Sequence, residues 1–329
     1  MAVARRNLVD KETPGFYHCT NRCVRRAFLC GFDKETGRNF DHRKAWLEKR
    51  MFVLCEIFSV EIYAYAIMDN HYHIVLYLDP LAPQQWSDEE VAERWLKVYP
   101  SRLDLPENAH LREMKKLAIM DNPEKLKEYR TRLGDLSWFM RRLNEPLAKL
   151  ANQEEFCTGR FWEGRFYSQA LLDEAAVLSC MAYVDLNPVR ARITEKLEES
   201  HHTSIKQRLD DIQSQTNQSK LDSPLETIAG HIRERKLSIT LREYTELVEW
   251  AGKSIIHPDK AAIPPHVAPV LDRLNLQQNH WLKQIESYGK QFYRVVGSIN
   301  KIRKRATELK LRYLRGISAA QKLYNSIAN

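Results

Sequence analysis

Two adjacent runs of alternating side chains constrain most strongly what this chain can fold into. Residues 61–68 and 71–78 read as two β-strands, and only Asp69 and Asn70 separate them. Both residue types tolerate the positive φ that a tight two-residue hairpin requires. The pattern therefore predicts an antiparallel hairpin whose second strand has the sequence HYHIVLYL.

The segments around this hairpin alternate between strand-like and helix-like patterns. Residues 16–23 (FYHCTNRC) read as a strand and residues 41–59 as an amphipathic helix. A second long helix is expected at residues 136–152, followed by a strand (FYSQALL) and a further helix. Without a charged helical insert at about residues 82–135, the order is strand, helix, strand, strand, helix, strand, helix. We therefore expect an α+β fold, with an antiparallel sheet and helices on one of its faces.

The chain is expected to have two parts. Residues 1–209 form the α+β unit with its insert, residues 210–226 are polar and read as a linker, and residues 227–329 form a helical region. Residues 276–329 hold eleven Lys/Arg and two acids, a formal charge of +9 against +8 for the whole chain. A basic segment of this kind commonly follows phosphate backbones, and a solvated helix face is the alternative.

The cysteine count and the hydropathy pattern bear on the compartment. The chain has six cysteines in 329 residues, without an apolar signal segment or an apolar run long enough to span a bilayer. These properties are typical of a protein from a reducing compartment. We expect a cytoplasmic protein that does not contact a membrane.

The strand HYHIVLYL carries two histidines in an otherwise apolar run. Alternate strand residues face opposite ways, so His71 and His73 share one face with Val75 and Tyr77. The other face is continuously apolar and is expected to pack on the helices. Two imidazoles side by side can converge on one divalent cation, although the pair alone also fits histidines that are merely exposed or hydrogen-bonded.

Common metal and phosphate motifs do not supply a partner for this pair. The sequence has no HExxH, and the spacing of Cys19, Cys23 and Cys30 does not fit the paired knuckles of a structural zinc site. The GKS at residues 252–254 lacks the upstream glycine of a phosphate-binding loop, since Leu247 occupies that position.

The segment DEAAVLSCMAYVDLNPVRARI is the second informative stretch. Asp173 is a suitable N-cap, and Pro188 is expected to end the helix. Tyr183 and Asn187 are spaced i and i+4, so their side chains meet on one helix face. A phenol and an amide oxygen one turn apart could supply a nucleophile and a metal ligand, whereas a tyrosine that only anchors the helix is the structural alternative.

The order of three motifs resembles that of the REP-associated tyrosine transposases, which are single-tyrosine members of the HUH nuclease superfamily. AIMDNHYH lies on the strand, GRFWEGRF precedes the fourth strand, and AYVDLNPVRA ends the last helix. The resemblance covers roughly residues 15–193, except that the family usually has a much shorter connection in place of the insert. It implies a ferredoxin-like antiparallel sheet, the HUH nuclease core, in a bacterial protein associated with the nucleoid.

In that family two histidines bind a divalent metal, a helix tyrosine attacks DNA, and an asparagine one turn later completes the metal site. Carried over residue by residue, the resemblance implies that His71, His73 and Asn187 bind Mg²⁺ or Mn²⁺. It also implies that Tyr183 is the nucleophile. The implied reaction cleaves and rejoins single-stranded or hairpin DNA through a 5′-phosphotyrosine.

The chain departs from the family pattern at several positions. Asp69 stands where proline is frequent, and Asp185 stands where histidine or another aromatic is frequent. An acid beside the nucleophile could alter metal affinity or add a ligand. Other members carry a tyrosine in the long helix where this chain has Leu147, and Tyr167 is a third candidate. Tyr183 is favoured because only it has a potential metal ligand one turn away.

Arginines interleaved with aromatic residues suit single strands and hairpins, because they combine phosphate contact with stacking. The expected DNA-binding residues are Arg22, Arg25, Arg26, Arg160, Trp162, Arg165, Arg190 and Arg192. Each arginine alone fits a surface salt bridge equally well.

Two other functions remain open from the sequence. A domesticated, non-catalytic protein that binds DNA hairpins would need neither the histidine pair nor Tyr183. A metal-dependent hydrolase that uses water would not need Tyr183. The presence of all these residues favours the transposase-like nuclease, and the helical, basic C-terminal region allows a DNA clamp, a homodimer surface or both.

Overall fold

The structure is a computed structural model. It describes residues 9–24, 30–33, 37–214, 221–232, 237–260, 262–291 and 294–324.

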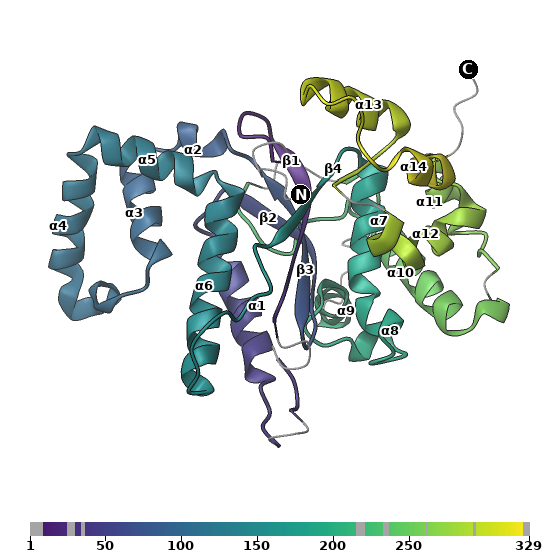
Figure 1. Cartoon of the computed structure of the whole chain (residues 1–329), viewed down its shortest axis with the longest axis horizontal. Helices are drawn as coiled ribbons and strands as arrows, with labels where there is room; N and C mark the ends of the chain where they lie inside the picture. Colours follow the sequence, from purple (N-terminus) through teal and green to yellow (C-terminus); the bar gives the residue numbers. More distant parts are fainter. Residues whose placement is uncertain are drawn as a thin grey trace.

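A five-stranded sheet with the order β2-β3-β1-β4-β5 lies at the centre of the molecule (Figure 1). Its strands are β1 (Gly15–Arg22), β2 (Val60–Ile67), β3 (His71–Leu78), β4 (Tyr167–Leu171) and β5 (Val295–Val296). The first four pair antiparallel, and β5 pairs parallel to β4. The predicted α+β class is confirmed. Strand β5 was not predicted, because two residues cannot show alternation.

The predicted hairpin is present between β2 and β3. The Met68 N–H donates to the His71 carbonyl at 2.8 Å and closes the turn. Neither Asp69 nor Asn70 adopts the positive φ that the sequence suggested. The hairpin is therefore right, while the expected backbone conformation of its turn is wrong.

Helices cover both faces of the sheet rather than one (Figure 1). On one face lie α1 (His42–Cys55) and α6 (Leu136–Glu154), where the Tyr72 hydroxyl donates to Oδ1 of Asn144 at 2.7 Å. On the other face lies α7 (Glu174–Asp185), whose Tyr183 ring contacts His73. The physical reason is visible in β3. Val75 and Tyr77 share the histidine face and are buried, so that face also needs a cover.

Side-chain caps fix where the two main sheet-covering helices begin. The Asp135 carboxylate accepts from the Ser137 and Trp138 amides at the start of α6. The Asp173 carboxylate accepts from the Ala176 amide at 3.0 Å, which confirms the N-cap expected for α7. Helix α6 continues through Pro146 without a break.

The insert is helical, as predicted, and projects away from the sheet (Figure 1). It consists of α2 (Ala82–Gln85), α3 (Asp88–Val98), α4 (Ala109–Met120) and α5 (Pro123–Leu133), with short 3₁₀ turns at Arg102–Asp104 and Pro106–Asn108. Ser87 caps α3 by accepting from the Glu90 amide, while the Glu90 carboxylate pairs with Arg94 instead of returning to the cap. Ser87 thus caps α3 without the reciprocal bond of a capping box.

The segment after α7 returns to the sheet. Helix α8 (Asn187–Arg190), a 3₁₀ turn at Leu197–Glu199 and α9 (Ser204–Ser214) follow in order, so α9 extends into the range expected to be a linker. The Ile62 amide of β2 donates to the Ala229 carbonyl at 2.8 Å. At Gly230 φ is +131°, and a Cβ would lie 2.8 Å from Cγ of Glu61, so only glycine fits this close approach.

The C-terminal region packs on α7. It contains α10 (Leu241–Ile256), a 3₁₀ turn at Pro258–Lys260, α11 (Ala268–Arg273), α12 (Gln278–Gln291), α13 (Ile299–Glu308) and α14 (Ile317–Leu323). The Trp281 indole N–H of α12 donates to Oγ of Ser179 in α7 at 3.1 Å, and both side chains are fully buried. None of the helices within the described ranges has the length and apolar composition that crossing a membrane requires.

Candidate active site

The two histidines of β3 lie on one face of the sheet, as predicted. The rings of His71 and His73 are 4.9 Å apart between centroids and nearly perpendicular. His73 is 6% exposed, because α7 lies over it, whereas His71 is partly exposed at the end of the strand. His71 is therefore the open end of the pair, and His73 is its covered end.

A third histidine, which the sequence interpretation missed, joins this pair. His18 of β1 shares the histidine face, and its Nε2 lies 2.9 Å from Nδ1 of His73, within hydrogen-bonding distance. The two rings are stacked at 5.1 Å. Alternation along FYHCTNRC could have indicated His18, but only once the pairing of β1 with β3 was known.

Burial keeps these imidazoles neutral. Desolvation lowers the pKa of His18 to about 4. Desolvation, reinforced by the charge of Arg22, also lowers the pKa of His71 to about 4. Burial and the neighbouring His18, His71 and Arg190 place the pKa of His73 well below its ordinary value. Neutral imidazoles present the nitrogen lone pairs that metal ligation needs.

Asn70 sets the tautomer of His71. Oδ1 of Asn70 lies 2.5 Å from Nδ1 of His71. An amide oxygen can only accept, so in this contact Nδ1 carries the proton and Nε2 of His71 carries the lone pair.

Tyr183 meets the histidines from α7. Its ring is perpendicular to that of His73, with centroids 5.5 Å apart, and edge-on to that of His18 at 6.0 Å. The guanidinium carbon of Arg190 lies 4.4 Å above the Tyr183 ring. The fold thus brings together His71, His73, Tyr183 and Arg190, four of the residues expected to act on DNA.

Helix α12 covers the tyrosine. Tyr288 stacks on Tyr183 with centroids 4.8 Å apart, and the Arg190 guanidinium donates to the Glu286 carbonyl at 2.7 Å. A Cβ at Gly289 would lie 3.0 Å from Oη of Tyr183. Tyr183 is consequently only 8% exposed. Tyr288 and Gly289 of α12 therefore cover the ring and the hydroxyl of Tyr183.

Asn187 and Asp185 have different surroundings. Asn187 begins α8 and is 7% exposed, and its side chain makes no hydrogen bond to a residue in the described part of the chain. The Asp185 carboxylate accepts from the Ser204 hydroxyl, the Ile205 amide and the Tyr244 hydroxyl, so it holds α9 and α10 against α7. Asp185 therefore has a packing role at its observed position.

The remaining candidate tyrosine positions differ in placement. Leu147, which occupies the position of a tyrosine in other members of the resembling family, is fully buried in the core. Tyr167 of β4 pairs with Thr20, which in turn pairs with His73, so Tyr167 lies on the histidine face two strands away. It is partly buried.

The expected DNA-binding residues are spread over several places. Arg22 is exposed at the end of β1 beside His71, and Arg160, Arg165 and Arg192 are exposed in loops. Arg25 and Arg26 lie outside the described residues. The expected stacking residue Trp162 instead lies on the opposite face of the sheet. Its indole N–H donates to the Asn144 carbonyl at 3.0 Å, and its ring packs edge-on against Tyr72.

Within the described residues, no cluster of three or more His, Cys, Asp and Glu side chains is arranged to hold a metal ion. The set implied by the resemblance has a different composition, two imidazoles and the Asn187 amide.

Comparison with known proteins gives one structural similarity. No protein-family model matches the chain, and no curated protein matches it. The chain is similar to a solved structure described as "Structure of the REP associates tyrosine transposase bound to a REP hairpin". The identity is 13% and the TM-score is 0.35, over 64% of this chain and 86% of that chain.

Proposed function

We propose that the chain is a metal-dependent transesterase that cleaves and rejoins single-stranded or hairpin DNA through a 5′-phosphotyrosine on Tyr183. The observation that supports this most directly is the meeting of Tyr183 with His73, 110 residues apart in sequence, at 5.5 Å between ring centroids. A purely structural tyrosine does not need a neutral histidine pair beside it. The proposed activity on DNA would place the protein with DNA in the cytoplasm.

The ligands that the resemblance implies for a divalent cation such as Mg²⁺ or Mn²⁺ are His71, His73 and the buried Asn187. Burial keeps the imidazoles unprotonated, and Asn70 leaves Nε2 of His71 with its lone pair. Nε2 of His18 lies 2.9 Å from Nδ1 of His73, and donation from Nδ1 of His73 would leave its Nε2 with the lone pair as well. A bound cation would make the scissile phosphorus more electrophilic and stabilise developing charge.

Tyr183 is the nucleophile of the proposed reaction. Its oxygen attacks phosphorus in line, the bond to the 3′-oxygen breaks, and the phenol proton is transferred to solvent while the leaving oxygen takes up a proton. The product is a phosphodiester of tyrosine and a free 3′-hydroxyl. Because the new bond keeps the phosphodiester energy, a second 3′-hydroxyl can reverse the step, which joins strands.

Arginines around the site would hold the DNA. Arg22 lies at the open end of the histidine pair, and Arg190 lies above the Tyr183 ring. Since Arg190 is also bonded to α12, DNA that draws its guanidinium toward phosphate would loosen the cover over Tyr183. Arg160 and Arg165 would contact phosphates further from the reacting atoms.

A second candidate function is a non-catalytic binder of DNA hairpins. The specific observation in its favour is the burial of Tyr183 under Tyr288 and Gly289. If α12 never leaves this position, the Tyr183 hydroxyl cannot reach phosphorus. The protein would then only bind DNA, through its arginines.

The decisive experiment uses 5′- and 3′-labelled single-stranded hairpin oligonucleotides with Mn²⁺ in a denaturing gel. The wild type is compared with Tyr183→Phe and with Tyr167→Phe, a matched loss of one hydroxyl on the same sheet face. We expect a metal-dependent protein–DNA adduct that disappears only in Tyr183→Phe. Cleavage without an adduct in all three proteins would indicate water as nucleophile, and binding without cleavage would indicate the non-catalytic binder.

A further inference from the structure

The segment from α13 to α14 carries cations that are not neutralised. Residues 299–324 hold eight Lys/Arg and one acid, Glu308. Glu308 pairs with Arg305, which also pairs with Asp10. The other seven cations form no ion pair within the described residues and are exposed: Lys301, Arg303, Lys304, Lys310, Arg312, Arg315 and Lys322.

The insert shows the opposite treatment of charge. It contains similar numbers of cations and acids, and four of its five arginines are paired. Arg112 lies 2.8 Å from Glu93 and 3.5 Å from Asp104, and Arg130 lies 2.5 Å from Asp88. A helical surface of this chain can therefore neutralise itself. The α13–α14 segment does not, so it keeps a positive field that an external polyanion can satisfy.

An aromatic side chain stands between these cations. Tyr313 is 67% exposed, in the sequence KLRYLRG, with Arg312 before it and Arg315 two residues after it. Leu311 is 39% exposed beside it. An acidic protein partner would need only the charges, whereas an exposed ring among arginines suits the stacking of an unpaired base.

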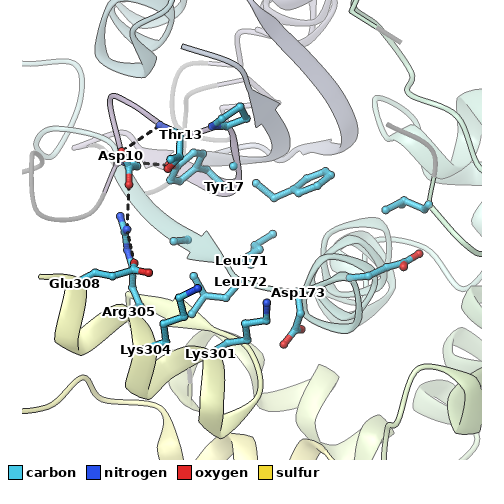
Figure 2. A pocket seen from close by; sticks show the side chains of 16 residues that line it. Asp10, Thr13, Tyr17, Leu171, Leu172, Asp173, Lys301, Lys304, Arg305 and Glu308 are labelled. Atoms are coloured by element: carbon cyan, nitrogen blue, oxygen red, sulfur yellow. Dashed lines mark hydrogen bonds and ion pairs between the residues drawn. The ribbon is translucent and has the colours of Figure 1, made fainter. Parts of the chain in front are cut away.

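The α13–α14 segment borders a cavity of about 490 Å³, which lies between α13, the start of β1 and the end of β4 (Figure 2). Lys301 and Lys304 extend from α13 into it, toward Leu172 and Asp173 (Figure 2). The Asp173 carboxylate already accepts from the Ser298 and Ala176 amides. Neither lysine forms an ion pair with an acid among the described residues.

The α13–α14 segment is fixed to the core, and the cavity beside it lies at the other end of β1 from His71. Strand β5 pairs with β4 immediately before α13, and the cavity lies at the Gly15 end of β1. His71 pairs with Arg22 at the opposite end of that strand. Eight residues of extended chain separate the two ends by about 24 Å, a distance that several nucleotides can span.

We propose that the surface formed by Lys301, Arg303, Lys304, Lys310, Arg312, Tyr313 and Arg315 is a second DNA-binding site. Its cations contact the phosphate backbone, and Tyr313 stacks on an unpaired base. This inference rests on the proposed DNA substrate but not on the chemistry of Tyr183.

The test measures DNA binding by fluorescence anisotropy in the Tyr183→Phe background, which cannot form an adduct, at several salt concentrations. One variant changes Lys301, Lys304, Arg312 and Arg315 to Gln. The matched control changes Lys97, Lys115, Lys125 and Lys127 of the insert to Gln, four cations that are also exposed. A further pair compares Tyr313→Ala with Tyr313→Phe.

We expect the first variant to bind a hairpin with a single-stranded extension tenfold or more weakly, with a salt slope smaller by about 2–3, while the control is unchanged. Tyr313→Ala should weaken binding about tenfold and Tyr313→Phe should not. Equal affinity and slope in both quadruple variants would overturn the proposal. Competition by polyglutamate as strong as by DNA, with no effect of Tyr313→Ala, would overturn it in favour of an acidic protein. Adduct formation in the Tyr183 protein at saturating DNA tests the proposed function separately.

Discussion

Gly289 leaves room for the phenol of Tyr183, since a methyl group at residue 289 would lie 3.0 Å from the Tyr183 oxygen. The contact joins the helix that carries the candidate nucleophile to a helix made more than a hundred residues later. It is direct enough to be measured as an energetic coupling between the two positions.

The first prediction concerns this contact and stability. Alanine within a helix is favoured over glycine by about 1 kcal/mol, but Gly289→Ala must also displace the Tyr183 hydroxyl. In the Tyr183→Phe background the oxygen is absent, so Gly289→Ala should stabilise more there than in the wild type. We expect a coupling of about 0.5–1 kcal/mol in a double-mutant cycle measured by urea unfolding. Additive effects would mean that the two helices do not touch at this point in solution.

The second prediction concerns the dependence of stability on pH. Burial raises the pKa of Asp185 to about 6, despite hydrogen bonds from Ser204 and Tyr244. The unfolded carboxyl ionises near pH 4, so between about pH 4 and 6 the folded state binds more protons than the unfolded state. Stability from this group therefore falls as pH rises through that window, by roughly 3 kcal/mol.

Asp185→Asn isolates this contribution, because asparagine cannot ionise. The difference in unfolding free energy, wild type minus variant, should fall between pH 4 and pH 7 and then stay constant. Chemical unfolding at a series of pH values measures it. A difference that rises with pH would show that the folded protein stabilises the carboxylate.

The third prediction concerns His18. His18→Phe keeps an aromatic ring in place but removes the hydrogen bond to Nδ1 of His73. Loss of such an orienting partner typically weakens metal affinity by about 10–100-fold, and we expect this for Mn²⁺ measured by titration with EPR detection of the free ion. His110→Phe, at an exposed position in α4, is the control and should bind as the wild type does. The same affinity in both variants would exclude His18 from positioning His73.

The fourth prediction separates packing from DNA contact in the GRFWEGRF loop. Trp162→Phe removes the hydrogen bond to the Asn144 carbonyl and should lower stability by about 1–2 kcal/mol. Arg165→Gln alters an exposed side chain and should change stability by less than about 0.5 kcal/mol while weakening binding to hairpin DNA. Thermal unfolding and anisotropy of the same two proteins distinguish the effects. A Trp162→Phe protein of normal stability and weakened DNA binding would restore the stacking role expected from the sequence.

The sequence predicted those helices and strands whose ends are set by residues close to them in the chain. The bounds of β3 follow from alternation at residues 71–78, and the start of α7 follows from the Asp173 cap. The helices on both faces could also have been inferred. Val75 and Tyr77 are apolar on the same face as His73, and a face that carries them is rarely left to solvent.

The parts that escaped prediction depend on which segments meet in three dimensions. His18 is one histidine among apolar neighbours until β1 is paired with β3. The cover of Tyr183 by Tyr288 has no local signature at all, because tyrosine and glycine on an amphipathic helix fit many surroundings. The role of Asp185 was open for the same reason, since its partners Ser204 and Tyr244 are distant in sequence.

The placement of Gly289 over Tyr183 also orders events during synthesis. Strands β1 to β4 and α7 are complete when residue 185 has been made, whereas α12 follows roughly a hundred residues later. At translation rates of about 5–20 residues per second, the ribosome needs about 5–20 s to add the residues that cover the tyrosine. During that interval the nascent chain holds the residues of β1 to β4 and Tyr183, but not yet the α12 residues that cover the tyrosine.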